Sequence, residues 1–407
     1  MKTVFDIAVI GGGLTGATAA LACSRRGYST VFVAPGKPVS DARTTALMMP
    51  SVQLLDELGI WTDVADIAGP LRCMRIIDGT NRLIRAPTVT FHAGELDIEA
   101  FGYNVPNSPL LTALSEAVSR NPAVFRYDSP LKSAVEGSDR AQLILTDNTE
   151  ISASLVVAAD GRESVARASA GISVRNWSYP QTAIVLNVSH AFDHADTCNE
   201  IHTEDGPLTQ VPLPGRQSSI VWAQRPADID RLLSLSKDQL ASALEERMDT
   251  MLGGMVVESG IQQFPFRGMI ARAFGKGRTL LVGEAGHVFP PIGAQGLNLG
   301  LRDVLELTDS ISAAGGPQNA SEAVRRYNRS RRGDIISRTI GADMLNRTLL
   351  NGFLPLQFAR SAALASLSSI APLRNFAMRE GMKPGGGMDV FRRDPDLGKD
   401  RRATYRS

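Results

Sequence analysis

The chain opens with an apolar run, a glycine-rich turn and an alanine-rich segment. Residues 6–10 predict a buried strand, residues 17–26 a helix, and residues 29–33 a second strand. Strands that alternate with helices favour a parallel sheet with helices on its faces. We therefore expect a β-α-β unit at the start of the chain.

The middle of the chain follows another pattern. In residues 73–105, and again in 175–268, short runs of alternating apolar and polar residues are separated by turns, which indicates antiparallel strands. The expected elements are strands at 182–189, 208–213 and 218–223 and an inserted helix at 237–251.

A strand–loop–helix pattern returns near the end. Residues 278–282 predict a buried strand, residues 299–312 a helix, and the remainder reads as helical. Ser108 is the expected N-cap of a helix at 110–119, with Pro109 at its first position. An amphipathic helix at 51–58 and strands at 142–146 and 153–159 complete the expected elements.

These patterns predict an α/β fold in which a Rossmann-type lobe is interrupted by a mainly antiparallel-sheet substrate lobe and followed by a C-terminal helical region. The predicted segments are 1–72, 106–174 and 269–315 for the first lobe, 73–105 and 175–268 for the second, 316–383 for the helical region and 384–407 for a disordered tail.

Composition narrows the class of protein. A formal net charge of +1 over 407 residues gives no reason to expect nucleic-acid binding. Three cysteines without a pairing pattern suit a reducing compartment, and the start of the chain leaves no room for a signal peptide. No apolar run is long enough to predict a membrane span. We expect a cytoplasmic protein without a metal site, with peripheral contact to the inner membrane as an alternative.

The first turn carries the spacing G-x-G-x-x-G at Gly11, Gly13 and Gly16. In this motif the first glycine permits a tight turn, the second admits a pyrophosphate and the third lets helix and strand pack closely. The strand at 29–33 is expected to end with an acid that binds a ribose, but Ala34 stands there. The spacing predicts dinucleotide binding with one anchor missing.

A second glycine-rich loop runs from Gly283 to Asn298. It follows a predicted strand, carries the carboxylate of Glu284 and a Pro-Pro pair, and enters the 299–312 helix. Glycines allow close backbone approach to a flat ligand, and a helix N-terminus favours negative charge. This combination suits a flavin, because the reduced ring carries negative charge.

Taken together with Asp160-Gly161, these loops resemble the FAD-dependent aromatic hydroxylases of the para-hydroxybenzoate hydroxylase type. Within that group the chain looks most like the ubiquinone-biosynthesis hydroxylases. The motifs that carry this resemblance, which covers nearly the whole chain up to about residue 382, are 41–47, 102–107, 159–164, 179–183, 212–213 with Trp222, and 287–298.

The resemblance implies roles for individual residues. The pyrophosphate of FAD would lie on the first loop, Arg43 would reach the ADP portion, and Glu284 would bind the ribitol chain, where relatives usually carry the shorter Asp. Asp160 would support FAD and the use of the reduced nicotinamide. The full set of expected cofactor residues is Gly11, Gly13, Thr15, Gly16, Arg43, Asn107, Asp160, Gly161, Glu284, Gly293, Gly296, Leu297 and Asn298.

The implied reaction is hydroxylation of a phenol-like ring through a flavin hydroperoxide, with molecular oxygen, NAD(P)H as the expected electron donor and a prenylated intermediate of ubiquinone biosynthesis as substrate. Other quinone-biosynthesis proteins are expected partners. We expect Pro290, Pro291 and Ile292 to form a dry pocket wall, and Val211, Pro212 and Trp222 to lie near the substrate. The alternatives are a catabolic hydroxylase of a small phenol, a prenyl-chain reductase, and a flavin-retaining scaffold with little turnover.

Several of these residues also have simpler interpretations. Arg43 could be a solvated side chain, Asp160 could cap the next turn, and His287 is expected to be a hydrogen-bonded structural histidine rather than a base. The apolar segment Phe353 to Leu373 fits either a helix packed on the body or a surface that contacts membrane or a partner.

Overall fold

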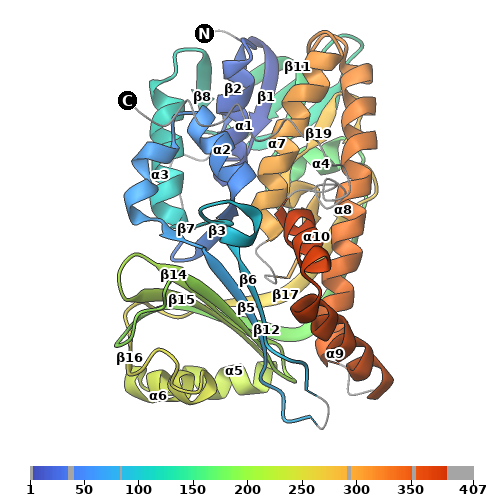
Figure 1. Ribbon diagram of the computed structural model, residues 1–407. Coiled ribbons are helices and arrows are strands. Elements are labelled where there is room, and N and C mark those ends of the chain that lie inside the picture. The colour runs from blue at the N-terminus through green and yellow to red at the C-terminus, as the bar shows by residue number, and fades with distance from the viewer. Residues whose placement is uncertain (1–2, 35–40, 83–84, 291–294, 351–353, 383–407) are drawn as a thin grey trace.

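The computed structural model describes residues 3–34, 41–82, 85–290, 295–350 and 354–382. Two sheets lie one above the other in Figure 1, and the last helices run along one side of both. The predicted tail at 384–407 lies outside the described residues.

The first sheet is built around five parallel strands in the order β19-β11-β1-β2-β8. Most residues of its central strands are fully buried, because helices cover a parallel sheet on both faces. The strands of this sheet are β1 Val4–Ile10, β2 Thr30–Val33, β8 Val124–Tyr127, β9 Leu131–Glu136, β10 Ala141–Leu145, β11 Glu150–Ala158, β18 Gly275–Lys276 and β19 Thr279–Leu281.

Helix α1 (Leu14–Arg25) packs between α3 (Asn107–Arg120) and α7 (Gln295–Ala313). Its small side chains allow this, since most of its residues are alanine, glycine, serine or threonine. The expectation that Ser108 caps the 110–119 helix is wrong: α3 begins at Asn107 with Pro106 as its N-cap. The Ser108 hydroxyl instead donates to the carbonyl of Asp41 at 2.7 Å.

The second sheet is mainly antiparallel, in the order β20-β17-β12-β15-β14-β13-β5-β6. Its strands are β5 Cys73–Asp78, β6 Val89–His92, β12 Val174–His190, β13 Thr197–His202, β14 Pro207–Leu213, β15 Gln217–Gln224, β16 Met255–Val257, β17 Gln262–Ala271 and β20 His287–Val288. Helices α5 (Pro226–Leu233) and α6 (Lys237–Arg247) cover the face turned away from the first sheet (Figure 1). The helix predicted at 237–251 therefore ends four residues early.

A small sheet of β3 (Thr44–Met48), β4 (Gly69–Pro70) and β7 (Gly102–Pro106) lies between the two large ones. The buried amide of Asn104 donates to the carbonyl of Pro212 at 2.9 Å and so ties this sheet to β14. Helix α2 (Met49–Glu57) follows β3 directly, and the short α4 (Val165–Ser169) follows β11.

The chain ends in α8 (Ala320–Leu350), α9 (Leu354–Ser369) and α10 (Ala371–Met382). Helix α8 contacts both large sheets: the Tyr327 hydroxyl donates to the carbonyl of Leu281 at 2.6 Å, and Asp343 accepts from Tyr179 at 2.8 Å. Within the described part of the chain, no helix is long and apolar enough to cross a membrane.

Candidate functional site

Three loops leave the same edge of the first sheet, at the carboxyl ends of β1, β11 and β19. The amide of Ala159 donates to Ile10 at 2.8 Å and that of Val282 to Ala158 at 2.9 Å, so the three strands end side by side. Ligands of parallel α/β sheets bind at this edge. The three loops of the sequence prediction, at 11–16, 160–161 and 283–284, therefore meet.

The three glycines of the first loop have different structural reasons. Gly11 has φ +118°, and a Cβ there would lie 2.2 Å from the carbonyl oxygen of Ala159. A Cβ on Gly16 would lie 2.0 Å from the oxygen of Gly11. Gly13 has an ordinary extended backbone, with φ −79° and ψ 177°, and among the described residues its Cβ would meet nothing within 4 Å. Protein packing explains Gly11 and Gly16, whereas no contact within the described part of the chain requires a glycine at position 13, and its contact with the pyrophosphate stays a prediction.

The start of α1 is also open to a ligand. Gly13 is its N-cap, no side chain caps it, and no acidic residue lies in its first turn. The first N–H groups of a helix lack intrahelical partners and attract anions. The residues present therefore fit the pyrophosphate of a dinucleotide.

Thr15 fills the junction between α1, the third loop and α7. A Cβ on Gly283, whose φ is +58°, would lie 3.0 Å from the Thr15 hydroxyl oxygen, and one on Gly300 would lie 2.8 Å from it. The Thr15 side chain therefore packs between the two glycines. Its expected contact with the cofactor stays a prediction.

The Asp160 carboxylate turns toward α4. It accepts hydrogen bonds from the Ser164 hydroxyl and, at 3.0 Å, from the amide of Ala166. Gly161 adopts φ +78°, which favours glycine. The structure thus shows the capping interpretation of Asp160, and its use of the nicotinamide stays a prediction.

Glu284 joins the second loop to the third. Its carboxylate accepts from Arg162 Nε at 3.1 Å and Nη2 at 2.9 Å, and both side chains are about half exposed. The buried Arg167 adds a second link, because it donates to the carbonyls of Ala285 at 2.8 Å and Arg162 at 2.7 Å. Glu284 therefore lies at the loop cluster, and its expected contact with the ribitol chain stays a prediction.

Arg43 directly precedes β3 and points toward the second sheet. It donates to both oxygens of Asp41, at 2.8 and 2.7 Å, and its guanidinium lies 4.8 Å from the ring centre of Phe264. The hydrogen bonds to Asp41 outweigh burial and raise the pKa of Arg43. Asn107 donates to the same Asp41 carboxylate at 2.9 Å. Arg43 is therefore held in place rather than free in solvent, and its contact with the ADP portion stays a prediction.

Helix α7 begins at Gln295, four residues before the predicted start, so Gly296 and Leu297 lie in its first turn. The buried Asn298 accepts from the amide of Met48 and the hydroxyl of Ser51, both at 2.8 Å. Its side chain thus ties α7 to β3 and α2. Of the expected pocket wall only Pro290 is described; Pro291, Ile292 and Gly293 lie outside the described residues.

The face of the second sheet that turns toward the first carries small and aromatic side chains. Ala183, Ala223 and Phe266 are buried together there, beside Tyr179 and Val221. Ala183 and Ala223 are paired across β12 and β15. Ala183 and Ala223 are 0% exposed and Phe266 is 1% exposed, so other protein atoms cover this cluster.

The placement of Trp222 corrects the sequence prediction. Trp222 packs with Ile220 and the residues of α5 and α6, because alternate residues of β15 point to opposite faces. It therefore faces away from the first sheet and does not line the site. Val211 does face the first sheet, in a cluster with Leu71, and Pro212 contributes the carbonyl that binds Asn104.

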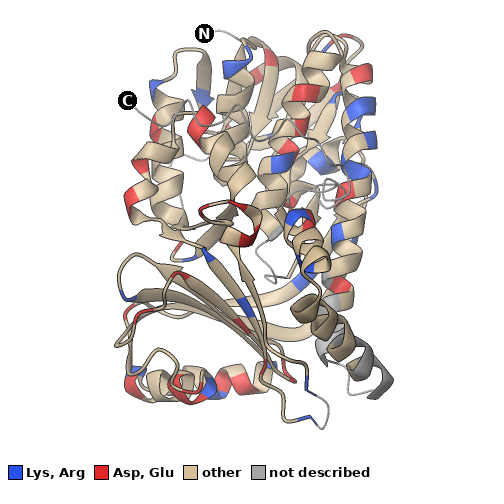
Figure 2. Ribbon diagram, viewed as in Figure 1, with Lys and Arg blue, Asp and Glu red and all other residues tan. Residues whose placement is uncertain are grey.

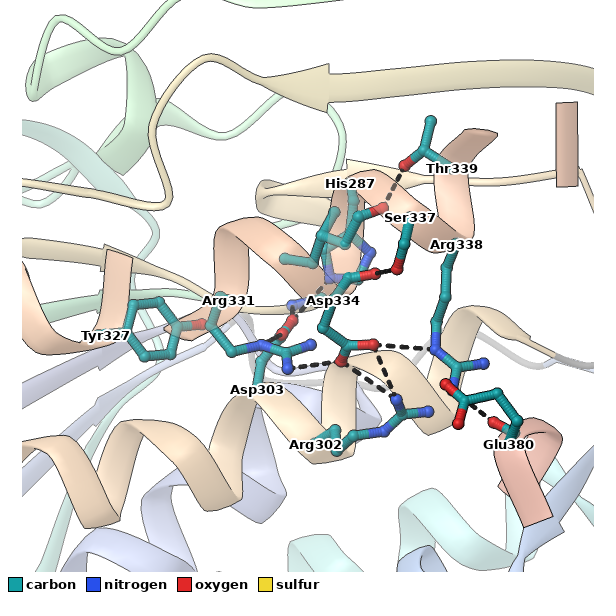
Figure 3. A network of polar contacts seen from close by, with 12 residues as sticks. His287, Arg302, Asp303, Tyr327, Arg331, Asp334, Ser337, Arg338, Thr339 and Glu380 are labelled. Atoms are coloured by element: carbon teal, nitrogen blue, oxygen red, sulfur yellow. Dashed lines mark hydrogen bonds and ion pairs between the residues drawn. The ribbon is translucent and has the colours of Figure 1, made fainter. Parts of the chain in front are cut away.

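His287 belongs to a buried polar network (Figure 3). Its Nε2 lies 2.7 Å from the Asp303 carboxylate, whose other oxygen accepts from Arg331 Nε at 2.7 Å. Sequence reasoning missed Asp303, although a signal existed. Asp303 is spaced four residues from Leu299 and from Leu307, so it lies on the apolar stripe of α7.

The network continues through Asp334, which binds Arg331, Arg302 and Arg338. Burial and the neighbouring Arg338 lower the pKa of Arg302 to about 10. Helix α8 is rich in basic residues, which are blue in Figure 2, with a few acidic residues, in red, among them. Among the described residues no group of His, Cys, Asp and Glu could hold a metal ion.

Comparison with known proteins identifies the ligand. The family described as "FAD binding domain" matches residues 4–338. The ubiquinone hydroxylase UbiL of Rhodospirillum rubrum is 31% identical over 93% of this chain and 90% of its own length. The 3-demethoxyubiquinol 3-hydroxylase of Escherichia coli is 30% identical over 92% of this chain and 97% of its own.

Solved structures agree on the fold. The p-nitrophenol 4-monooxygenase of Pseudomonas putida superposes with a TM-score of 0.74 at 19% identity, over 94% of this chain and 97% of that one. Klebsiella pneumoniae HpxO, solved with FAD and uric acid, superposes with a TM-score of 0.73 at 18% identity, over 93% of this chain and 96% of that one. The chain therefore belongs to the FAD-binding-domain family of FAD-dependent monooxygenases, a family of aromatic hydroxylases that typically use NAD(P)H.

Proposed function

We propose that this protein hydroxylates the ring of a prenylated precursor of ubiquinone. The observation that carries the proposal is the similarity to two ubiquinone hydroxylases, at 31% and 30% identity, over more than nine tenths of this chain.

Bound FAD would supply the chemistry that transfers one oxygen atom from O₂ to the ring, with electrons from NAD(P)H. The protein's part is to bind, orient and exclude water. Gly13 and the start of α1 would hold the pyrophosphate, and Glu284 the ribitol. The N-terminus of α7 would stabilise negative charge on the reduced ring. Pro290, the described residue of the expected pocket wall, would help to keep the reacting edge dry.

Exposed apolar side chains on the C-terminal helices support a lipid-soluble substrate. On α8, Ile340 and Met344 are 53% and 60% exposed, and Ile370, between α9 and α10, is 49% exposed, although all three are large and apolar. Helix α9 extends beyond the second sheet in Figure 1. A prenylated phenol partitions into lipid, so we infer a peripheral membrane contact here rather than a purely packed helix.

The test combines a gene deletion with purified protein. Deletion is expected to accumulate a prenylated phenol that lacks one hydroxyl, and the wild-type gene, but not a Gly13→Leu variant, restores the quinone. Purified protein is expected to couple NAD(P)H oxidation to hydroxylation of a prenylated phenol.

The other candidate functions give different results in the same assays. A catabolic hydroxylase turns over small phenols and leaves quinone levels normal after deletion. A prenyl reductase consumes NAD(P)H without oxygen, and a scaffold retains FAD that NAD(P)H does not reduce. Any of these results would remove the proposal.

A further inference from the structure

The third loop and α7 meet α1 at an unusually close contact. A Cβ on Gly300 would lie 3.2 Å from the Cα of Gly283 and 2.8 Å from the Thr15 hydroxyl oxygen. Three segments that belong to the FAD site therefore touch through two glycines and one small side chain. Glycine allows this approach but supplies no side chain to hold it.

Asp303 lies one helical turn after Gly300 and faces the same junction. Its Oδ2 accepts from the amide of Gly283 at 2.9 Å and from His287 Nε2 at 2.7 Å, and its Oδ1 accepts from Arg331 Nε at 2.7 Å. The side chain is fully buried. A buried carboxylate thus bonds directly to the backbone of the flavin-side turn.

The charge on Asp303 is maintained by its neighbours. Burial alone raises the pKa of a carboxyl group, but the charges of His287 and Arg331 outweigh it and hold the pKa of Asp303 below its usual value. An ionised carboxylate only accepts, so His287 carries a proton on Nε2. Arg331 also binds Asp334, at 2.6 Å, and so links Asp303 to the rest of the network (Figure 3).

We propose that Asp303 is a positioning residue of the FAD site: it fixes the Gly283 turn against α1 and the first turns of α7, and so holds the three segments in the arrangement that binds FAD. This inference rests on the FAD site described above. It assigns a function to one member of the network, whereas the Asp334 carboxylate binds arginine side chains in the described part of the chain, and none of these contacts involves the Gly283 turn.

The difference between Asp303 and Asp334 provides a matched pair of variants. Asp303→Leu with Arg331→Met removes the acceptor of the Gly283 amide together with the arginine that would otherwise be buried unpaired. Arg331→Met with Asp334→Leu removes the same arginine and one carboxylate, but leaves Asp303 on Gly283 and His287. Both double variants keep the net charge of the chain unchanged.

The measurement is the FAD dissociation constant of each apoprotein, at a temperature where thermal unfolding shows all of them folded. We expect FAD to bind at least about tenfold more weakly to the Asp303 double variant than to wild type, because one hydrogen bond that holds the site is lost. The FAD dissociation constant of the Asp334 double variant should stay within about twofold of the wild-type value. The absorbance spectrum of bound flavin should change in the first variant alone.

Equal FAD affinities in the two double variants would overturn the inference, since a purely structural role predicts that both behave alike. If the first double variant does not fold, Asp303→Asn is compared with Asp334→Asn by the same criterion. Wild-type protein that binds no FAD would instead refute the FAD site itself, a failure that the wild-type measurement alone reveals.

Discussion

Replacing Gly13 and Gly16 separately by alanine is expected to have different effects: Gly13→Ala should weaken FAD binding, and Gly16→Ala should lower the stability of the apoprotein. The two glycines are three residues apart in one motif, yet their surroundings differ. A Cβ on Gly16 would lie 2.0 Å from the carbonyl oxygen of Gly11, whereas one on Gly13 would meet no atom of the described residues within 4 Å.

The magnitudes follow from these distances. Overpacking against rigid backbone costs roughly 1–3 kcal/mol, so Gly16→Ala is expected to lower apoprotein stability by about that amount. Gly13 already has a backbone conformation that alanine adopts, with φ −79° and ψ 177°, so Gly13→Ala is expected to change apoprotein stability by less than about 1 kcal/mol. If the new methyl group displaces a pyrophosphate oxygen, the loss of one charge-assisted hydrogen bond, about 1.5–3 kcal/mol, weakens FAD binding roughly 10- to 150-fold.

The assay is thermal unfolding of both apoproteins beside titration with FAD, followed by flavin fluorescence. The Gly13→Ala apoprotein should have the melting temperature of wild type and bind FAD poorly, and the Gly16→Ala apoprotein should have a lower melting temperature. The reasoning is refuted if Gly13→Ala binds FAD as tightly as wild type, or if its apoprotein loses as much stability as Gly16→Ala.

Three further predictions concern side chains. Glu284→Ala should weaken FAD binding by roughly 3- to 30-fold, while Arg162→Ala, which removes the same half-exposed ion pair, should do so much less; neither should lower stability by more than about 1 kcal/mol. The pKa values of Asp303 and Asp334 are lowered in the folded state, so the ionised carboxylates stabilise the fold fully above the ordinary carboxyl pKa of about 4, and this stabilisation is lost as pH falls below that value. The melting temperature of the wild type should therefore fall steeply below about pH 4, and that of Asp334→Asn less steeply. Trp222→Phe should lower the melting temperature without changing KM. A raised KM with unchanged stability would instead show that Trp222 lines the substrate site.

Local patterns were enough to predict strands β1, β2, β10, β11 and β19 of the first sheet, whereas its strands β8, β9 and β18 were not predicted. The apolar run before Gly11 and the helix after Gly16 interact mainly with each other, so sequence neighbours carry the information. The predicted ends of helices were wrong where a contact with a residue far away in the sequence determines them. Ser108 looks like an N-cap, but its hydroxyl binds Asp41, 67 positions away in the chain.

The alternation of apolar and polar residues along a strand did not predict which face of the strand meets the ligand. The pattern around Trp222 shows that residues 221 and 223 point to the other side, but not which side the first sheet covers. The role of Asp303 was hidden for a similar reason. A carboxylate on an apolar stripe signals a buried partner, while the partners, Gly283 and Arg331, become visible only once the chain has folded.

The discontinuous origin of the site sets when it can form during synthesis. Its loops begin at residues 11, 160 and 283, and the carboxylate that holds the third loop is residue 303. At about 5–20 residues per second, a ribosome takes roughly 15–60 s to pass from the first loop to Asp303. Once β11 (Glu150–Ala158) has been made, the edge that later receives β19 lacks its parallel neighbour until Thr279–Leu281 follow. FAD is captured only when about three quarters of the polypeptide has been made, so the cofactor does not protect that edge from aggregation in the nascent chain.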